Sequence, residues 1–259
     1  MLAWVHNLPI VWLVVVVCAG IAVITAAIYL GVIKLAVGDR ARAFKGVSPG
    51  MLPPMGLVFG LLVGFLVAQL WSDSSQARDA VNREASSLRS VVLLASAFPG
   101  APEQSLDGLV RRHIQVAVNQ EWPAMEHQHA TLVVVPTALA GALHEAVSLD
   151  PKSFGQQTAQ REIVTSVENA LDARRQRIIL SQSDVNWVKW TAVVALAVLT
   201  LVAIALVHSD NRRTTAIAMS VFAAAAAVTL IVIASQDRPF NGHFRVKPDV
   251  LLQVLPRSG

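Results

Sequence analysis

Four long runs without a charged residue divide this chain, and they constrain its fold more than any motif does. The runs are Ile10–Ile33, Pro54–Trp71, Trp190–Val207 and Thr214–Ser235, and none of them contains Asp, Glu, Lys or Arg. Each run is long enough to cross a hydrocarbon layer of about 30 Å as a helix. We therefore expect an all-α integral membrane protein with four transmembrane helices.

The runs form two pairs around one polar segment, which predicts a helical module inserted between transmembrane helices 2 and 3. The expected organisation is a transmembrane hairpin over residues 1–71, the module over 72–184, a second hairpin over 185–235 and a tail over 236–259. Apolar residues recur in the module at three- and four-residue spacing, which is typical of helices. They predict helices over about 81–95, 106–122, 132–147 (with a break at Pro136) and 156–183.

The composition favours the lipid bilayer as the main partner. Hydrophobic residues make up 54% of the chain and charged residues 15%, which is too apolar for an ordinary soluble domain. The formal net charge is +4, but the basic residues gather in short loops beside the apolar runs, as the bilayer requires. We therefore expect no nucleic-acid partner.

The single cysteine, Cys18, lies inside the first apolar run, so the chain has no internal disulfide framework. No Lys or Arg precedes Cys18, and the run continues to Ile33. A cleaved signal has a basic start and a shorter apolar centre. We therefore expect the first run to be a retained transmembrane helix.

The positions of the cations predict an orientation in the membrane. The connections 34–50 and 209–213 carry six of them: Lys34, Arg40, Arg42, Lys45, Arg212 and Arg213. Loops rich in Lys and Arg stay in the cytoplasm. The module and both termini would then be extracytoplasmic.

Small residues repeat along the second run at four-residue spacing, at Gly56, Gly60, Gly64 and Ala68. Water cannot drive helices together in lipid, so small residues matter because they let two backbones approach closely. We expect this stripe to pack against another helix, either of the same chain or of a second subunit.

A second set of side chains lies roughly opposite the glycines: Phe59, Leu62, Phe65 and Gln69. One interpretation is a face buried in the core or turned to lipid. The other is a set of pore-lining side chains that form a hydrophobic constriction in an oligomeric channel.

The polar module offers little catalytic chemistry. Its candidate metal ligands are His113, Glu126, His127, His129 and His144, but their spacing matches no metal-binding pattern. No phosphate-binding glycine loop and no nucleophile motif are present. We expect no catalytic residue, no metal and no cofactor, and an intramembrane enzyme is the least supported alternative.

Three motifs in order resemble one bacterial family. They are Glu121-Trp122-Pro123 with Met125, then Arg174-Arg175 with Arg177, and then Asp237-Arg238-Pro239-Phe240 with Gly242 and Pro248. Together with the four runs, they resemble the bestrophin-like domain family, whose bacterial members are four-span membrane proteins of unknown function. The tail motif itself can act as a structural clamp or as a ligand site, and we favour the clamp.

The resemblance implies a location in the bacterial cell membrane and a candidate role as an oligomeric ion channel. Ions and further copies of the chain are then its implied partners, and Phe59, Leu62 and Phe65 are its implied neck residues. Bestrophins keep their helical module in the cytoplasm, whereas the cation count of this chain predicts the opposite side. The alternative function is a membrane-tethered sensor or scaffold whose helical module binds a partner.

Overall fold

The computed structural model describes residues 10–35, 49–183, 187–241 and 245–255. The chain divides into two compact units. The membrane unit comprises Met1–Trp71 and Asp184–Asp237, and the polar unit comprises Ser72–Ser183 and Arg238–Gly259. No strand occurs among the described residues, which confirms the predicted all-α class.

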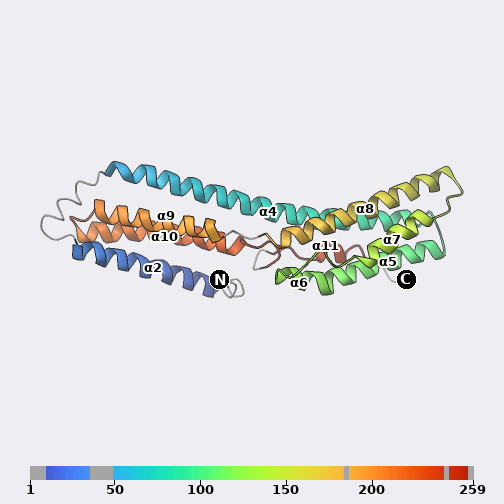
Figure 1. Ribbon diagram of the computed structural model, residues 1–259, viewed down its shortest axis with the longest axis horizontal. Helices are drawn as coiled ribbons and strands as arrows, with labels where there is room; N and C mark the ends of the chain where they lie inside the picture. The colour runs from blue at the N-terminus through green and yellow to red at the C-terminus, as the bar shows by residue number, and fades with distance from the viewer. Residues whose placement is uncertain (1–9, 36–48, 184–186, 242–244, 256–259) are drawn as a thin grey trace. The chain divides into compact units, whose positions relative to one another are not determined.

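The membrane unit contains four helices that are long and apolar enough to span a bilayer. They are α2 (Ile10–Leu35), the first part of α4 (Leu52–Ala95), α9 (Trp187–Val207) and α10 (Arg212–Gln236), with a short 3-10 turn at Pro49–Met51 before α4 (Figure 1). The four long apolar helices predicted from the sequence are confirmed. Helix α10 begins at a side-chain cap, because Asn211 Oδ1 accepts hydrogen bonds from the backbone N–H groups of Arg213 and Thr214.

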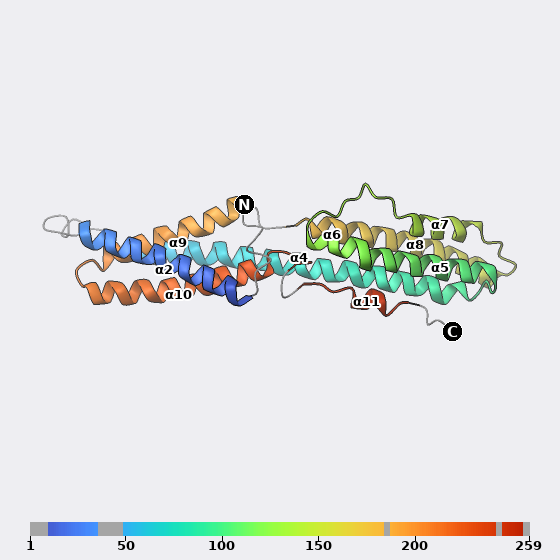
Figure 2. The ribbon, with the colours of Figure 1, turned by 90° about the horizontal axis from the view of Figure 1, so that it is seen from below.

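The membrane unit has small internal cores and a large apolar exterior. Phe59 of α4 lies in one core and packs against Phe222 of α10, with ring centroids 5.5 Å apart. Leu201 of α9 and Met219 of α10 lie in the other core. Helices α2, α9 and α10 run side by side (Figure 2). Many of their large side chains face outward, as lipid requires.

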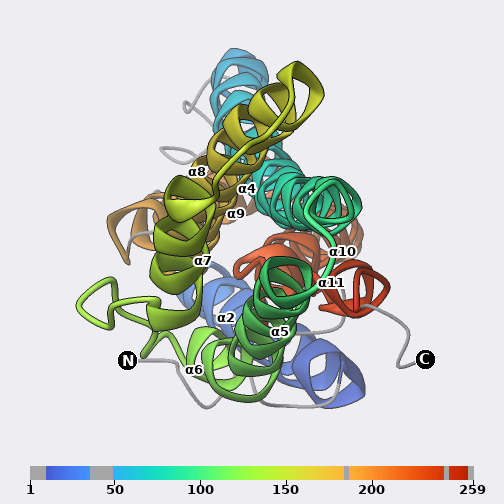
Figure 3. The ribbon, with the colours of Figure 1, turned by 90° about the vertical axis from the view of Figure 1, so that its right-hand side faces the viewer.

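The polar unit is a bundle built on the rest of α4, which runs without a break to Ala95. Its other helices are α5 (Ala101–Val116), α6 (Trp122–Glu126), α7 (Thr137–Ser148), α8 (Phe154–Ser181) and α11 (Asp249–Leu252). Helix α7 packs against both α5 and α8 (Figure 3). The turn between α4 and α5 contains Gly100 at a φ of 99°, a conformation that favours glycine.

Two predicted helix boundaries in the polar unit are wrong. The stretch 132–135, predicted to be helical ahead of the break at Pro136, is not helical, and α7 begins after that break at Thr137, because a proline disfavours a helical residue before it. The helix predicted to close near 122 continues through a π-helical turn, Ala117–Glu121, into α6. Pro123 is tolerated there because it falls within the first turn of α6.

One continuous hydrophobic core fills the polar unit, and the C-terminal tail contributes to it. Phe240 and Leu251 are 1% and 0% exposed and belong to the same cluster as Leu88, Ile114 and Ile163. The chain therefore returns from α10 to complete the core of the polar unit.

Candidate functional site

A buried ion pair joins α4 to α8 at the centre of the polar unit. Glu84 and Arg177 are both 0% exposed. Arg177 Nε donates to Glu84 Oε2 at 2.7 Å, and Arg177 Nη2 donates to Glu84 Oε1 at 3.0 Å. This two-pronged arrangement is the strongest geometry for a guanidinium and a carboxylate.

Glu121 extends the pair into a chain of alternating charges. It accepts a hydrogen bond from Arg177 Nη2 at 2.7 Å and another from Arg174 Nε at 2.7 Å. Arg174 is 4% exposed and also donates to the backbone carbonyl of Val134 at 3.3 Å. Two carboxylates and two guanidinium groups thus neutralise one another inside the bundle.

His113 of α5 completes this buried ion network, which comprises Glu84, His113, Glu121, Arg174 and Arg177. Its Nε2 lies 2.8 Å from Glu84 Oε1, and the side chain is buried. An ionised carboxylate can only accept, so Nε2 is the donor. The network therefore ties together α4, α5, α8 and the π turn before α6.

The network controls the pKa of each carboxylate. Burial alone raises the pKa of Glu84, but the charge of Arg177 and the hydrogen bonds from His113 and Arg177 outweigh it and lower the pKa from 4.5 to about 2. The same balance lowers the pKa of Glu121, with Arg177 and Arg174 opposing burial. Burial lowers the pKa of Arg177, and its two carboxylate partners more than reverse this effect and raise it. All three groups are therefore charged at neutral pH.

Trp122 covers one face of the network. The Arg177 guanidinium carbon lies 4.8 Å from the centroid of the Trp122 ring, a cation–π contact. Arg177 Nη1 also points at the sulfur of Met125, at 3.4 Å. Glu121 ends the π turn and Trp122 begins α6. Because of this irregular segment, two adjacent residues, Glu121 and Trp122, both contact the buried guanidinium group of Arg177.

The C-terminal tail closes over Trp122. The rings of Trp122 and Phe240 meet edge to face with centroids 5.8 Å apart, and Trp122 Nε1 donates to the carbonyl of Val246 at 3.2 Å. Asn241 Nδ2 donates to the carbonyl of Glu126 at 3.0 Å, and the Glu126 side chain pairs with Arg245. The tail is thus fixed to α6 at two places, Trp122 and Glu126.

Comparison with known proteins identifies the family. A model of the bestrophin-like domain matches residues 19–251. The chain belongs to the bestrophin-like domain family. This confirms the resemblance inferred from the three motifs.

The bestrophin-like fold is also evident in solved structures. Crystal structures of two variants of a bacterial bestrophin homologue from Klebsiella pneumoniae are similar to this chain, each with a TM-score of 0.66. They share 10% and 11% sequence identity with it, over 91% and 95% of this chain and 96% and 97% of theirs. Similarity at this identity concerns the fold alone. No curated protein matches the chain.

The three motifs of this bestrophin-like chain meet in space. Glu121, Arg174 and Arg177 belong to the network, the Trp122 ring lies against Arg177, and Phe240 packs on Trp122. The remaining motif residues lie elsewhere: Arg175 and Pro123 are exposed, Asp237 and Pro239 are buried at the end of α10, Arg238 is half-buried, and Pro248 precedes α11. Gly242 lies outside the described residues. The partners of Arg174 and Arg177 are Glu121 and Glu84.

Sequence reasoning missed Glu84, which holds the centre of the network. A signal was present, because Glu84 falls within the apolar stripe that Val81, Ala85 and Leu88 form on α4. A charged residue on a buried helix face must have a partner. His113 occupies the same kind of position on α5, and the two residues meet.

The predicted residues of the membrane unit lie in two environments. Gly56, Gly60, Gly64 and Ala68 all face outward. Phe59 is buried and Leu62 half-buried, whereas Phe65 is 72% exposed and Gln69 is exposed and accepts a hydrogen bond from Lys189 Nζ at 2.6 Å.

The polar unit offers paired charges rather than reactive groups. Within the described residues, no three His, Cys, Asp or Glu side chains gather as they would around a metal ion. The rings of His127 and His129 lie 6.4 Å apart. The buried ion network instead stabilises one arrangement of helices, because each buried charge requires its partner in place.

Proposed function

We propose that this chain is one subunit of an oligomeric ion channel in the bacterial cell membrane, in which α4 lies at the interface between subunits and beside the pore. Membership of the bestrophin-like family supports a channel, since bestrophins are oligomeric anion channels. The proposal covers a channel without naming its ion. The main support for an oligomer is one observation on α4.

The glycine stripe of α4 is left open by the rest of the chain. A methyl group placed at Gly56, Gly60 or Gly64 would meet no atom within 4 Å among the described residues. The sequence allowed two partners for this stripe, another helix of the chain or a second subunit. The open stripe favours the second subunit, because small residues serve close helix packing in lipid.

A row of exposed side chains about 100° round α4 from the glycine stripe supplies the side chain for a constriction. Phe65 is 72% exposed, and Leu57 and Leu61 beside it are 64% and 52% exposed. Phe59 and Leu62 pack toward the core of the membrane unit. In the proposal, Phe65 narrows the pore and gates it by excluding water, while Phe59 and Leu62 support it from behind and Gln69 marks its polar end.

The proposed orientation follows the cation count. Lys34 at the end of α2 and Arg212 and Arg213 at the start of α10 mark the cytoplasmic side. The polar unit is then extracytoplasmic, opposite to the arrangement in bestrophins. A cysteine at exposed Phe154, in a Cys18→Ala background, should react with an impermeant maleimide in intact cells. Labelling only after lysis would reverse the orientation.

Two measurements test the channel: the mass of the protein particle in detergent and the flux of ions through liposomes that contain it. The purified protein should be a multimer in detergent and should release ions from liposomes. Phe65→Ala should raise the flux several-fold because it widens the constriction, whereas Val221→Ala on α10, equally outward at 68% exposure, should leave it unchanged. A single-chain particle, or liposomes that hold their ions, would refute the proposal.

A further inference from the structure

The polar unit carries one exposed apolar segment that its own core does not explain. Leu132, Val133, Val134 and Val135, in the connection between α6 and α7, are 44%, 86%, 61% and 66% exposed. This connection stands out from the side of the bundle (Figure 3). Consecutive apolar side chains exposed outside lipid mark a contact surface. We call this segment the valine loop.

The valine loop is held in a defined place. Arg174 Nη2 donates to the carbonyl of Val134 at 3.3 Å, and Gln182 Nε2 donates to the carbonyl of Ala130 at 2.7 Å. Within the loop, Val133 N donates to Thr131 Oγ1 at 2.9 Å. The loop is therefore anchored to one stretch of α8, residues 174–182, and one anchor belongs to the buried ion network.

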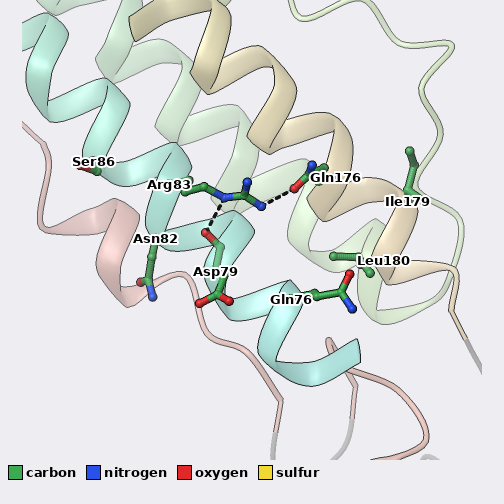
Figure 4. Close-up of a pocket in the computed structure, with 8 residues that line it drawn as sticks. All are labelled: Gln76, Asp79, Asn82, Arg83, Ser86, Gln176, Ile179 and Leu180. Carbon is green, nitrogen blue, oxygen red and sulfur yellow. Dashed lines mark hydrogen bonds between the residues drawn. The ribbon is translucent and has the colours of Figure 1, made fainter. Parts of the chain in front are cut away.

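A groove of about 760 Å³ lies between α4 and α8 of the same unit (Figure 4). Ile179 and Leu180 are its apolar wall on α8, and Ile179 is 47% exposed. Gln76, Asn82 and Gln176 supply amide groups around it, and Arg83 donates to Gln176 across it. Its volume suits a short peptide segment, with apolar surface for side chains and amides for the backbone.

The groove and the valine loop lie on opposite faces of α8 at the same level. At about 100° per residue, the groove residues of α8 (Gln176, Ile179 and Leu180) and the loop anchors (Arg174 and Gln182) fall on arcs whose centres are about 150° apart. The groove residues lie between the two anchors in sequence. The chain thus presents an apolar projection on one side of α8 and, on the other, a recess whose wall includes Ile179 and Leu180.

The geometry points to a contact in which the valine loop of one subunit enters the α4–α8 groove of the next subunit. The bilayer holds parallel copies of one chain at one depth, so side-by-side copies meet at equal heights. A projection and a recess at the same height on opposite faces form a head-to-tail contact, which closes into a ring when the rotation between copies allows it. The occupant is a second copy, so the inference rests on the proposed oligomer and names its interface.

Engineered cysteines test this contact in the full-length protein. In a Cys18→Ala background, Val133→Cys is combined with Ile179→Cys in one chain, and mild oxidation in liposomes should give a ladder of linked multimers. The matched control pairs Val133→Cys with Glu162→Cys, an exposed residue on the groove face of α8 but about 25 Å away along the helix. The control should give no ladder, since a disulfide needs Cβ atoms about 4 Å apart.

The possible outcomes distinguish a contact between the valine loop and the next subunit from other locations of the loop. A multimer that conducts but forms no ladder at 133 and 179 overturns the contact and leaves the channel standing, whereas a single-chain particle removes both. An equal ladder with Glu162→Cys, or linked dimers alone, overturns the head-to-tail contact. Loss of maleimide labelling at position 133 on moving from detergent into liposomes, without a ladder, would assign the loop to lipid and overturn the contact too.

Discussion

The two units of this chain are built by opposite rules. In the membrane unit the large apolar side chains face outward, with Val23 of α2 and Phe65 of α4 exposed by 68% and 72%. In the polar unit the charges point inward, and Glu84 and Arg177 have no exposed surface. Lipid accepts apolar side chains and rejects charge, whereas water lets a bundle bury its charges only when every partner is supplied.

The forces that stabilise each unit internally differ accordingly. The polar unit gains from expelling water from one continuous core. Helices in lipid lack that driving force and depend on close packing, and in the membrane unit Ala197, Ala223 and Ala226 supply the small side chains in the cores. A substitution should therefore change the stability of each unit in a way that depends on whether water or lipid surrounds it.

The largest effect is expected at the centre of the buried ion network. Arg177→Met should destabilise the polar unit by about 3–5 kcal/mol, because it leaves the Glu84 carboxylate buried without its guanidinium partner. Hydrogen exchange measures this locally: amides of α5 and α8 should lose protection, while those of α9 and α10 should keep theirs.

Arg175→Met is the matched control for that loss. Arg175 is exposed two residues away on the same helix, so its replacement should change stability by no more than about 0.5 kcal/mol. Equal losses of protection in both variants, or a loss in α9 and α10 as large as in α5, would break the distinction between the units.

A smaller effect is expected from acid. The folded pKa of Glu84 is lowered from 4.5 to about 2, so its ionised form stabilises the folded polar unit above pH 4.5, and this contribution disappears as the pH falls from 4.5 toward 2. The full shift corresponds to about 3 kcal/mol. Glu121, whose pKa is also lowered, adds to the loss in the same direction.

Denaturant unfolding across this pH range measures the effect. Glu84→Gln should flatten the slope of stability against pH between 4.5 and 2, whatever it does to stability at neutral pH. An unchanged slope would show that Glu84 does not carry the linkage. The four spans contain no ionisable carboxylate, so unfolding of the membrane unit should respond less to acid.

The division into lipid-facing and water-facing parts was predictable, because it depends on local composition. Four uncharged runs are a sufficient signal for four helices, and each was found in place. The break at Pro136 was predictable from the proline itself, whereas the continuation of the preceding helix through a π turn to Glu126 was not, because its apolar spacing carries no signal for a π turn. Helix ends are decided by such details rather than by periodicity.

The candidate site was predictable in its parts and not in its assembly. The motifs pointed to Trp122, Arg177 and Phe240, but nothing in their spacing brings α6, α8 and the tail together. Glu84 was missed because only the apolar residues of its helix were considered, although a charged residue on that apolar face requires a partner. A search for charged residues on apolar helix faces would have found both Glu84 and His113.

The smallest effect concerns one methyl group in each unit. Within a helix, replacing glycine by alanine stabilises by about 0.5–1 kcal/mol. At Gly141 of α7 the new Cβ would lie 3.1 Å from Leu109 Cδ2, so Leu109 must shift and the net gain should be close to zero. At Gly60 of α4 the new Cβ would meet no atom within 4 Å among the described residues outside its own stretch of helix backbone, so a single chain should keep the whole gain.

The effect of Gly60→Ala on the multimer therefore shows whether a second subunit or lipid covers this face of α4. If a neighbouring subunit packs on the stripe, Gly60→Ala should stabilise the isolated chain yet shift the multimer toward single chains in detergent, since the methyl group separates the two backbones. Gly141→Ala should leave the assembly unchanged. If Gly60→Ala also leaves it unchanged, the stripe faces lipid, and the outward face of α4 is then explained by the bilayer alone, as the outward faces of α2 and α10 are.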